Sequence, residues 1–262
     1  MKRSITVVKV GGKIVEEKAS LQSLLQEFSS LPGLKVLIHG GGRTATALAT
    51  RMGVETKMID GRRVTDDEML RIVTMVYGGL VNKNVVAQLD ALGIRALGLT
   101  GADMNVILSH RRPVKDVDYG YAGDVDKVDG KMLSILIKQG IVPVMAPLTH
   151  DGKGQLLNTN ADTIAAETAK ALARYYDVTL VFCFEKNGVL RNPDDDESVI
   201  SRITPQDYEQ LKADGIIQGG MKPKLDNSFT ALKEGVKRVV ITRVGQIGTD
   251  KGTVIEEDNT NL

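Results

Sequence analysis

The sequence predicts an α/β fold in which a mostly parallel sheet is covered by helices on both faces. Short β-branched runs alternate with longer stretches of helical periodicity along the 262 residues. The strand-like runs are almost continuously apolar, as expected for parallel strands that are buried on both faces. With 42% hydrophobic and 26% charged residues, the chain can bury a substantial core.

The elements follow in the order strand, helix, strand. The run ITVVKV predicts the first strand, and leucine and phenylalanine at helical spacing over residues 21–31 predict the helix. The run KVLIHG predicts the next strand. Later strands are predicted by IRALGLT, IVPVMAPL, VTLVFCF and RVVIT. Between residues 100 and 130, short extended pieces with turn residues predict hairpins instead of crossover helices.

Two helix starts carry capping signals. Thr65 and Glu68 in VTDDEML predict a capping box, with the helix beginning at about Asp66. Thr204 and Asp207 in ITPQDYEQL predict a second cap, and the proline between them suits a first helical position.

The composition excludes several classes of protein. The net charge is +1, so no long-range field recruits nucleic acid or an anionic membrane. The single cysteine, Cys183, rules out an intramolecular disulfide framework and a cysteine-only metal cluster. Lys9 interrupts the first apolar stretch too early for a secretory signal, and no apolar run approaches the roughly 20 residues that cross a bilayer. We expect a cytoplasmic protein.

Three glycine clusters follow predicted strands or precede helices, at residues 11–12, 40–42 and 219–220. A backbone without Cβ approaches a ligand closely, and the next helix points free N–H groups at an anion. Glycine pairs also simply form tight turns. Three such clusters favour anion-binding turns.

The HGGG run at residues 39–42 can also be compared with the motifs of two other kinds of site, an esterase oxyanion loop and a dinucleotide-binding turn. An esterase oxyanion loop needs a G-x-S-x-G elbow, which the sequence lacks. A dinucleotide site fits better, because Gly40, Gly42 and Ala45 satisfy G-x-G-x-x-A and Asp60 follows about 20 residues later. A Walker A loop is absent, so a nucleoside triphosphate would be bound without a P-loop.

Charged residues stand beside these glycines. Lys9 ends the first strand, where an ionised side chain either snorkels or reaches the sheet edge at which α/β proteins bind ligands. Lys224 follows the last glycine cluster, and Arg63 suits a bidentate clamp for a carboxylate. Asn160 and Asp162 either only stabilise a helix start or also orient the lysines. Together these residues suit phosphoryl transfer between two anionic reactants.

Five motifs occur in register along the chain: VVKVGG, HGGG, GRRVT, LLNTNAD and GGMKPK. By their order and separations the chain resembles the amino acid kinase superfamily, and within it the N-acetylglutamate kinases, from about residue 5 to the C-terminus. The resemblance implies one domain, residues 1–262, built as a three-layer αβα sandwich with an open, mainly parallel central sheet. Residues 1–175 would bind the acyl-amino acid and mediate dimerisation, and residues 176–262 would bind MgATP.

The resemblance also implies roles for single residues. Lys9 and Lys224 would stabilise the transferring phosphoryl group, and Asp162 would organise them. The acyl-amino acid would be held by Gly41, Gly42, Arg63 and Asn158. The nucleotide would be held by Gly11 and Gly12 at its phosphates and otherwise by Glu185, Gly188, Leu190, Ile216 and Gln218. Mg²⁺ would arrive with ATP, without protein ligands of its own.

The reaction implied by the resemblance is phosphorylation of the γ-carboxylate of N-acetyl-L-glutamate by ATP, the second step of arginine biosynthesis. A carboxylate oxygen would attack ATP in line, without a covalent enzyme intermediate. The nearest rivals are aspartate, glutamate and carbamate kinases. A dinucleotide-dependent oxidoreductase would bind NAD independently of Lys224, and a nucleotide-binding sensor would tolerate loss of Lys9 and Lys224.

The chain departs from the family pattern in three places. Residues 184–189, FEKNGV, replace the usual [ST]-D-V-x-G-[VI], and Lys222 replaces an aliphatic residue. Arg62 replaces an apolar neighbour of the substrate arginine. A further guanidinium there predicts a further carboxylate in the substrate, such as a succinyl group in place of acetyl, unless Arg62 points to solvent.

Arginine-inhibited relatives carry an additional N-terminal helix that joins dimers into a hexamer. In this sequence the first predicted strand begins close to Met1. We therefore expect a homodimer that is insensitive to arginine.

Overall fold

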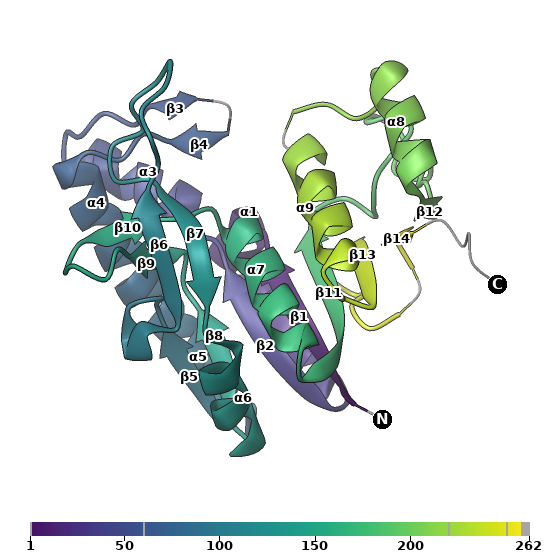
Figure 1. The fold of residues 1–262 in the computed structure, drawn as a ribbon, viewed down its shortest axis with the longest axis horizontal. Helices are drawn as coiled ribbons and strands as arrows, with labels where there is room; N and C mark the ends of the chain where they lie inside the picture. Colours follow the sequence, from purple (N-terminus) through teal and green to yellow (C-terminus); the bar gives the residue numbers. More distant parts are fainter. Residues whose placement is uncertain (1, 60, 220, 250, 258–262) are drawn as a thin grey trace.

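An eight-stranded sheet crosses the computed structural model, which describes residues 2–59, 61–219, 221–249 and 251–257 (Figure 1). Its strands are β1 (Arg3–Val10), β2 (Leu34–His39), β5 (Ala96–Leu99), β8 (Val142–Met145), β11 (Tyr176–Phe184), β12 (Arg202–Ile203), β13 (Arg238–Arg243) and β14 (Thr253–Ile255). Their order is β12-β14-β13-β11-β1-β2-β8-β5. Neighbouring strands are parallel except β13 and β14, so the predicted open, mainly parallel sheet is confirmed.

Helices cover both faces of this sheet. One face carries α6 (Gly130–Lys138), α7 (Ala161–Ala173), α8 (Pro205–Ala213) and α9 (Met221–Lys233). The other carries α1 (Gly12–Glu16), α2 (Lys18–Ser30), α3 (Gly42–Arg51), α4 (Asp67–Val73), the π-helix η1 (Thr74–Val81) and α5 (Asn82–Ala91). Among the described residues, no helix combines the length and the apolar character needed to cross a membrane.

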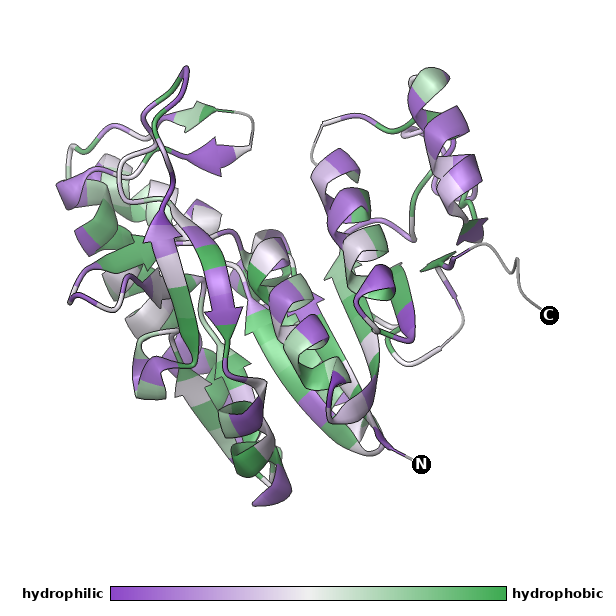
Figure 2. Cartoon of the chain, in the orientation of Figure 1, coloured by the Kyte–Doolittle hydropathy of each residue, from purple (hydrophilic) through white to green (hydrophobic). Residues whose placement is uncertain are grey.

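Two hydrophobic cores lie on opposite sides of the sheet because successive side chains of a strand point in opposite directions. Val7 of β1 belongs to the core under α7, whereas Val8 belongs to the core under α2. The apolar strands therefore lie between helices whose outer faces are hydrophilic (Figure 2). This arrangement is the predicted three-layer sandwich.

Two small sheets stand beside the main one. They comprise β6 (Ile107–Arg111), β7 (Gly123–Val128), β9 (Leu148–His150) and β10 (Leu156–Asn158) in one, and β3 (Met58–Ile59) with β4 (Arg62–Arg63) in the other. The short helical turn η2 (Asp103–Asn105) precedes β6. Strands β6 and β7 pair antiparallel, which confirms the predicted hairpin. The β3–β4 hairpin lies on the side of the molecule toward which β1 and β2 run (Figure 1).

The two predicted helix caps have different outcomes. Thr204 and Asp207 cap α8 reciprocally, as predicted. At α4, however, the cap is Asp66, whose side chain accepts from the amide of Met69 at 2.8 Å, and the helix begins at Asp67. The prediction for Thr65 was therefore wrong.

Thr65 does not cap α4 because its hydroxyl has tertiary partners. The hydroxyl of Thr65 donates to the Arg63 carbonyl at 3.0 Å and accepts from the side-chain amide of Asn158 at 3.0 Å. The residue is completely buried. Long-range contacts have outweighed a local preference.

One ionisable side chain at the end of β2 is completely buried. His39 lies with its Nδ1 2.7 Å from the Gly40 carbonyl oxygen and its Nε2 3.1 Å from the side-chain nitrogen of Asn82. Burial lowers the pKa of His39 to about 4, against a smaller opposing effect of the Gly40 carbonyl, and the charge of Lys83 lowers it further. The imidazole is therefore neutral at pH 7.

His39 should make the stability of the protein depend on pH below neutrality. Because the folded pKa of about 4 lies below the unfolded value of 6.5, protonation favours the unfolded chain. This stabilisation is complete above pH 6.5 and is lost as the pH falls toward 4. At pH 5 the wild-type protein should have lost about 2 kcal/mol relative to His39→Asn. Urea unfolding of both proteins between pH 5 and 8 measures this, and parallel curves would contradict it.

Candidate active site

Lys9, Asp162 and Lys224 meet at the carboxyl end of β1. Lys9 follows Val7 on the sheet face covered by α7 and α9, where Asp162 and Lys224 stand in the first turns of those helices. The Nζ atom of Lys9 lies 2.8 Å from Oδ1 of Asp162, and that of Lys224 lies 2.7 Å from Oδ2. The structure thus brings together the three residues that the sequence singled out for phosphoryl transfer.

The local sequence explains how Asp162 is held. Asn160 caps α7, and its side-chain oxygen accepts from the amides of Asp162 at 2.8 Å and Thr163 at 3.3 Å. Capping fixes the start of the helix and leaves the Asp162 carboxylate free to turn toward the lysines. The helix cap and the orientation of the lysines, which the sequence presented as alternatives, occur together.

The triad of Lys9, Asp162 and Lys224 is largely withdrawn from water. Its side chains are 12%, 20% and 10% exposed, and Lys224 Nζ lies 4.7 Å from the centre of the Phe182 ring. Burial raises the pKa of Asp162, but the two ammonium groups outweigh it and hold that pKa well below its usual range. Burial also lowers the pKa of Lys224.

With both lysines protonated, the triad carries an excess of one positive charge in a region of low dielectric constant, where an anion is strongly attracted. The Lys9 ammonium has three N–H donors and contacts Asp162 through one carboxylate oxygen, so it keeps donors for another acceptor. Among the described residues, no three His, Cys, Asp or Glu side chains are grouped to hold a metal ion.

Two of the predicted glycine turns pack directly against each other, because β1 and β2 are adjacent and parallel. A Cβ on Gly40 would lie 3.1 Å from the Gly12 nitrogen. A Cβ on Gly41 would lie 3.0 Å from the ring of Tyr77. In the described part of the chain, no protein acceptor receives the N–H groups of Gly12, Gly41 or Gly42. These donors remain available to an anion.

Of the third glycine cluster, Gly219 lines the same cleft as Asp162. Gly219 has φ +53° and precedes α9, whereas Gly220 lies outside the described residues. Asp60, the acidic residue of the dinucleotide interpretation, also lies outside them. Gly11, in the first cluster, donates its N–H to the Cys183 carbonyl at 2.9 Å, which ties the first turn to β11.

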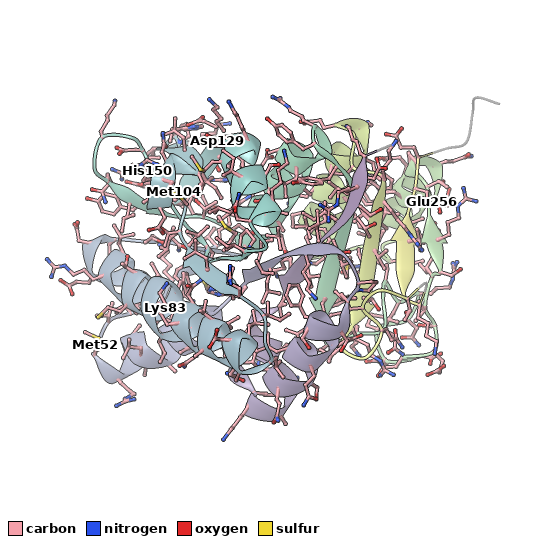
Figure 3. The ribbon with its side chains drawn as sticks, turned by 90° about the horizontal axis from the view of Figure 1, so that it is seen from below. Met52, Lys83, Met104, Asp129, His150 and Glu256 are labelled. Carbon is pink, nitrogen blue, oxygen red and sulfur yellow. The ribbon has the colours of Figure 1, made fainter. Side chains whose placement is uncertain are left out.

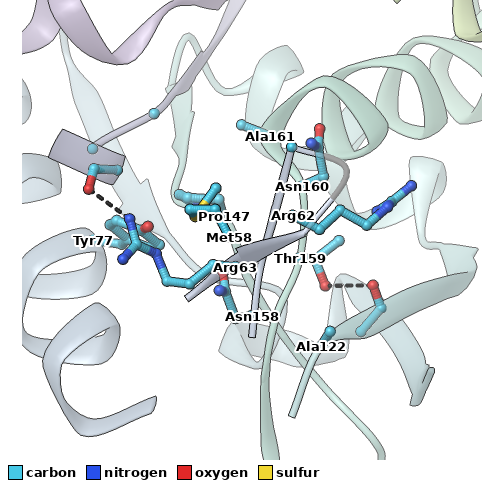
Figure 4. Close-up of a pocket in the computed structure, with 15 residues that line it drawn as sticks. Met58, Arg62, Arg63, Tyr77, Ala122, Pro147, Asn158, Thr159, Asn160 and Ala161 are labelled. Carbon is cyan, nitrogen blue, oxygen red and sulfur yellow. Dashed lines mark hydrogen bonds between the residues drawn. The ribbon is translucent and has the colours of Figure 1, made fainter. Parts of the chain in front are cut away.

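A pocket of about 190 Å³ opens beside the second glycine turn (Figure 4). It is lined by residues 40–42, 58, 61–63, 77, 122–123, 147 and 158–161. Of the residues predicted for the acyl-amino acid, Gly41, Gly42, Arg63 and Asn158 all line this pocket. Asn158 also donates to Thr65, so its amide is held in place by the buried hydroxyl.

Arg63 has a structural role as well as a place in the pocket. Its Nη2 donates to the Gly42 carbonyl at 2.7 Å and to the Thr46 hydroxyl at 2.9 Å, which joins β4 to the start of α3 (Figure 4). The residue is only 8% exposed. The sequence interpretation of Arg63 as a free carboxylate clamp omitted these internal bonds.

Arg62 extends to the opposite side of β4 from Arg63 (Figure 4). It is half-buried and lines both the pocket and an adjoining cleft of about 790 Å³ that also contains Asp162 and Lys222. Gly61 and Asn160 likewise line both cavities. The pocket beside the second glycine turn therefore opens toward the triad.

Sequence reasoning missed Tyr77. This residue lies in the π-helix η1, lines the pocket and packs against Gly41. Burial raises the pKa of Tyr77 against the opposing charge and hydrogen bond of Arg63, so the phenol is neutral. The run TMVYGGLV shows ordinary helical apolarity, and nothing in it signals the wider π-helical turn that brings Tyr77 to the pocket.

The residues predicted for the nucleotide lie near the ends of β11 and α8. Glu185 and Gln218 are exposed, and Ile216 packs against the core. Gly188 and Leu190 are buried, and a Cβ on Gly188 would lie 2.7 Å from the Thr253 hydroxyl. Packing against Thr253 therefore requires a glycine at position 188, independently of any ligand.

Comparison with known proteins extends over nearly the whole chain. Residues 4–243 match the model of the amino acid kinase family. Acetylglutamate kinase from Phocaeicola vulgatus is 64% identical over 257 residues, which cover 98% of this chain and 100% of that protein.

Solved structures show the same fold. A Streptococcus mutans protein superposes with a TM-score of 0.80 at 28% identity, covering 96% of this chain and 98% of the other. Carbamate kinase from Giardia lamblia bound to AMP-PNP superposes with a TM-score of 0.72 at 14% identity, covering 98% and 99%. The second likeness is one of fold alone.

Proposed function

This chain belongs to the amino acid kinase family, and we propose that it transfers the γ-phosphoryl group of ATP to the γ-carboxylate of N-acetyl-L-glutamate, the second step of arginine biosynthesis. The products are an acyl phosphate and ADP. The triad of Lys9, Asp162 and Lys224 carries the proposal, because it places two ammonium groups on one carboxylate where an anion can join them.

Phosphoryl transfer requires mainly that the reactants be positioned and that charge on the transferring group be neutralised. Lys9 and Lys224 supply that neutralisation from two elements far apart in the sequence. Asp162 orients them and is not the base, because its pKa is held well below the usual range. No base is required, since the attacking γ-carboxylate is already ionised at pH 7.

The acceptor occupies the pocket formed with the second glycine turn. Gly41 and Gly42 offer N–H groups to the acceptor, while Arg63 and Asn158 line another part of the pocket wall. Because the pocket opens toward the triad at Asn160, a γ-carboxylate at that opening faces Lys9 and Lys224. Residues 1–175 then form the acceptor-binding lobe.

The nucleotide binds to residues 176–262, with its phosphates against Gly11 and Gly12. Glu185, Gly188, Leu190, Ile216 and Gln218 hold the adenosine half, and the buried Gly188 and Leu190 act through their backbone. Mg²⁺ enters as part of the substrate MgATP, held through the nucleotide phosphates. Lys222, which lines the cleft, adds positive charge near them.

The proposed function is tested by a hydroxamate assay of acyl phosphate formation with MgATP and a panel of acidic substrates. Lys9→Ala and Lys224→Ala should each lower kcat with N-acetyl-L-glutamate on the order of 100-fold or more, because each removes charge that stabilises the transition state. Lys233→Ala, at the exposed far end of α9, is the matched control and should leave kcat unchanged.

Other outcomes would identify a rival function. An NAD oxidoreductase would form no acyl phosphate and would bind NAD whether or not Lys224 is present. A nucleotide-binding sensor would bind ATP and tolerate loss of both lysines. Retained activity in either alanine variant would remove that lysine from the mechanism.

We further propose that Arg62 admits an acyl group with an additional carboxylate. Burial lowers the pKa of Arg62 and the charge of Arg112 adds to this, against smaller opposing effects of Asp124 and Tyr119. Within the described part of the chain, no carboxylate lies within 4.0 Å of the Arg62 guanidinium to pair with it. Arg112 is already ion-paired with Asp124, so a substrate carboxylate would serve Arg62 as its own direct counterion.

The acyl preference is measured as kcat/KM for N-succinyl- and N-acetyl-L-glutamate. Arg62→Leu should lower kcat/KM for the succinyl compound about tenfold, the effect of losing one charge-assisted contact, and should spare the acetyl compound. A clear preference of the wild-type enzyme for the acetyl compound would end this part of the proposal.

We also propose that the protein is a homodimer. Exposed apolar side chains lie on η1 and on the edge strand β5, where Met75 is 50%, Leu80 54% and Leu97 37% exposed. Light scattering should give twice the chain mass of 28.3 kDa, and Leu80→Glu should shift the mass toward the monomer. A wild-type monomer would contradict the proposal.

A further inference from the structure

A buried hydrogen-bond relay lies behind the second glycine turn. His39 and Asn82 are 0% and 1% exposed, and Asn82 Nδ2 lies 3.1 Å from His39 Nε2 and 3.0 Å from the Val144 carbonyl oxygen. Lys83, at the surface of α5, reaches Asn82 Oδ1 at 3.2 Å (Figure 3). A Cβ on Gly98 would lie 1.8 Å from Asn82 Oδ1. A glycine at this position of β5 therefore leaves room for the side-chain amide of Asn82.

The partners of Asn82 determine which imidazole nitrogen carries the proton. The Val144 carbonyl and the Lys83 ammonium fix the side-chain amide, because the first can only accept and the second can only donate. The remaining N–H of Asn82 therefore points at Nε2 of His39, which must accept. The neutral ring then carries its hydrogen on Nδ1 and donates it to the Gly40 carbonyl at 2.7 Å.

This bond sets the direction of the next amide. In a trans peptide the C=O and N–H groups point to opposite sides. Because the Gly40 carbonyl faces His39, the N–H of Gly41 points away from His39, and a Cβ on Gly12 would lie 3.6 Å from the Gly41 nitrogen. The N–H of Gly41 is thus directed to the side where the two glycine turns meet.

We propose that His39 and Asn82 are positioning residues for the acyl-amino acid, which hold the peptide between Gly40 and Gly41 so that its N–H faces the bound substrate. This inference rests on the proposed function. A peptide flanked by glycines rotates easily when nothing holds its carbonyl. Once rotated, the peptide would present the Gly40 carbonyl oxygen to an anionic substrate and lose a charge-assisted hydrogen bond.

The test distinguishes the contribution of Nδ1 of the His39 ring from that of Nε2. His39→Leu removes the donor to Gly40 and should raise KM for N-acetyl-L-glutamate about tenfold or more, with KM for MgATP within about twofold. His39→Asn keeps an N–H donor near the position of Nδ1 and should restore most of the acceptor KM. Asn82→Ala removes the donor that makes Nε2 the acceptor but leaves the Gly40 carbonyl beside Nδ1, so its acceptor KM should lie between those of the wild type and His39→Leu.

A buried hydrogen bond elsewhere in the fold provides the control for stability. Ser134 bonds the Tyr176 hydroxyl at 2.8 Å on the opposite face of the sheet. Ser134→Ala should lower the melting temperature and leave both KM values unchanged.

The outcomes distinguish this inference from the proposed function. If the wild-type protein forms no acyl phosphate from N-acetyl-L-glutamate, the proposed function fails, and the inference fails with it. If the wild type is active but His39→Leu shifts both KM values alike or neither, His39 is not a positioning residue. The same holds if His39→Asn is as impaired as His39→Leu. Should His39→Leu not fold, an unchanged acceptor KM in Asn82→Ala overturns the inference.

Discussion

The ion pairs of Asp162 with Lys9 and Lys224 set the main constraint on this structure. One carboxylate must reach ammonium groups from a central strand and from a helix more than 200 residues later in the chain. This is possible only if β1 ends where α7 and α9 begin. The order of the sheet provides that arrangement, because β11 pairs with β1 and β13 pairs with β11, and the helices that precede these two strands, α7 and α9, pack on the same face.

The same constraint explains the charge balance of the site. A buried carboxylate with one lysine would be neutral and would have little need of a ligand. With two lysines the group carries one excess positive charge, and this charge is held where water cannot screen it well. The glycine turns stand beside this charge, and their close approach leaves backbone donors without protein acceptors. Charge and donors are therefore present before any ligand binds.

Much of this arrangement was predictable, because it depends on features that the sequence expresses locally. The apolar runs predicted the parallel strands, and Thr204 capped its helix because both members of the capping box lie within four residues. Lys9 could be placed at a ligand-binding edge from strand direction alone. The distance between Lys9 and Lys224 could not be predicted, because this distance depends on how α9 packs.

The errors arose where distant contacts compete with local preferences. Thr65 would cap α4 by sequence, but Asn158 holds its hydroxyl from 93 positions away. Tyr77 was missed because a π-helix has no distinct apolar pattern, and the internal bonds of Arg63 depend on the packing of β4 against α3. His39 was seen only as part of a glycine motif, because its partner Asn82 comes from another element.

The central position of β1 also governs how the chain must fold. Of the described strands β1 is made first, but it lies between β2 and β11, and the latter begins only at Tyr176. A nascent chain emerging from the ribosome can pair β1 on one side while the other edge stays open until about two thirds of the protein has been synthesised. An apolar edge exposed for that long favours slow folding and intermolecular strand pairing. The topology that creates the active site therefore leaves one edge of its central strand unpaired during much of synthesis.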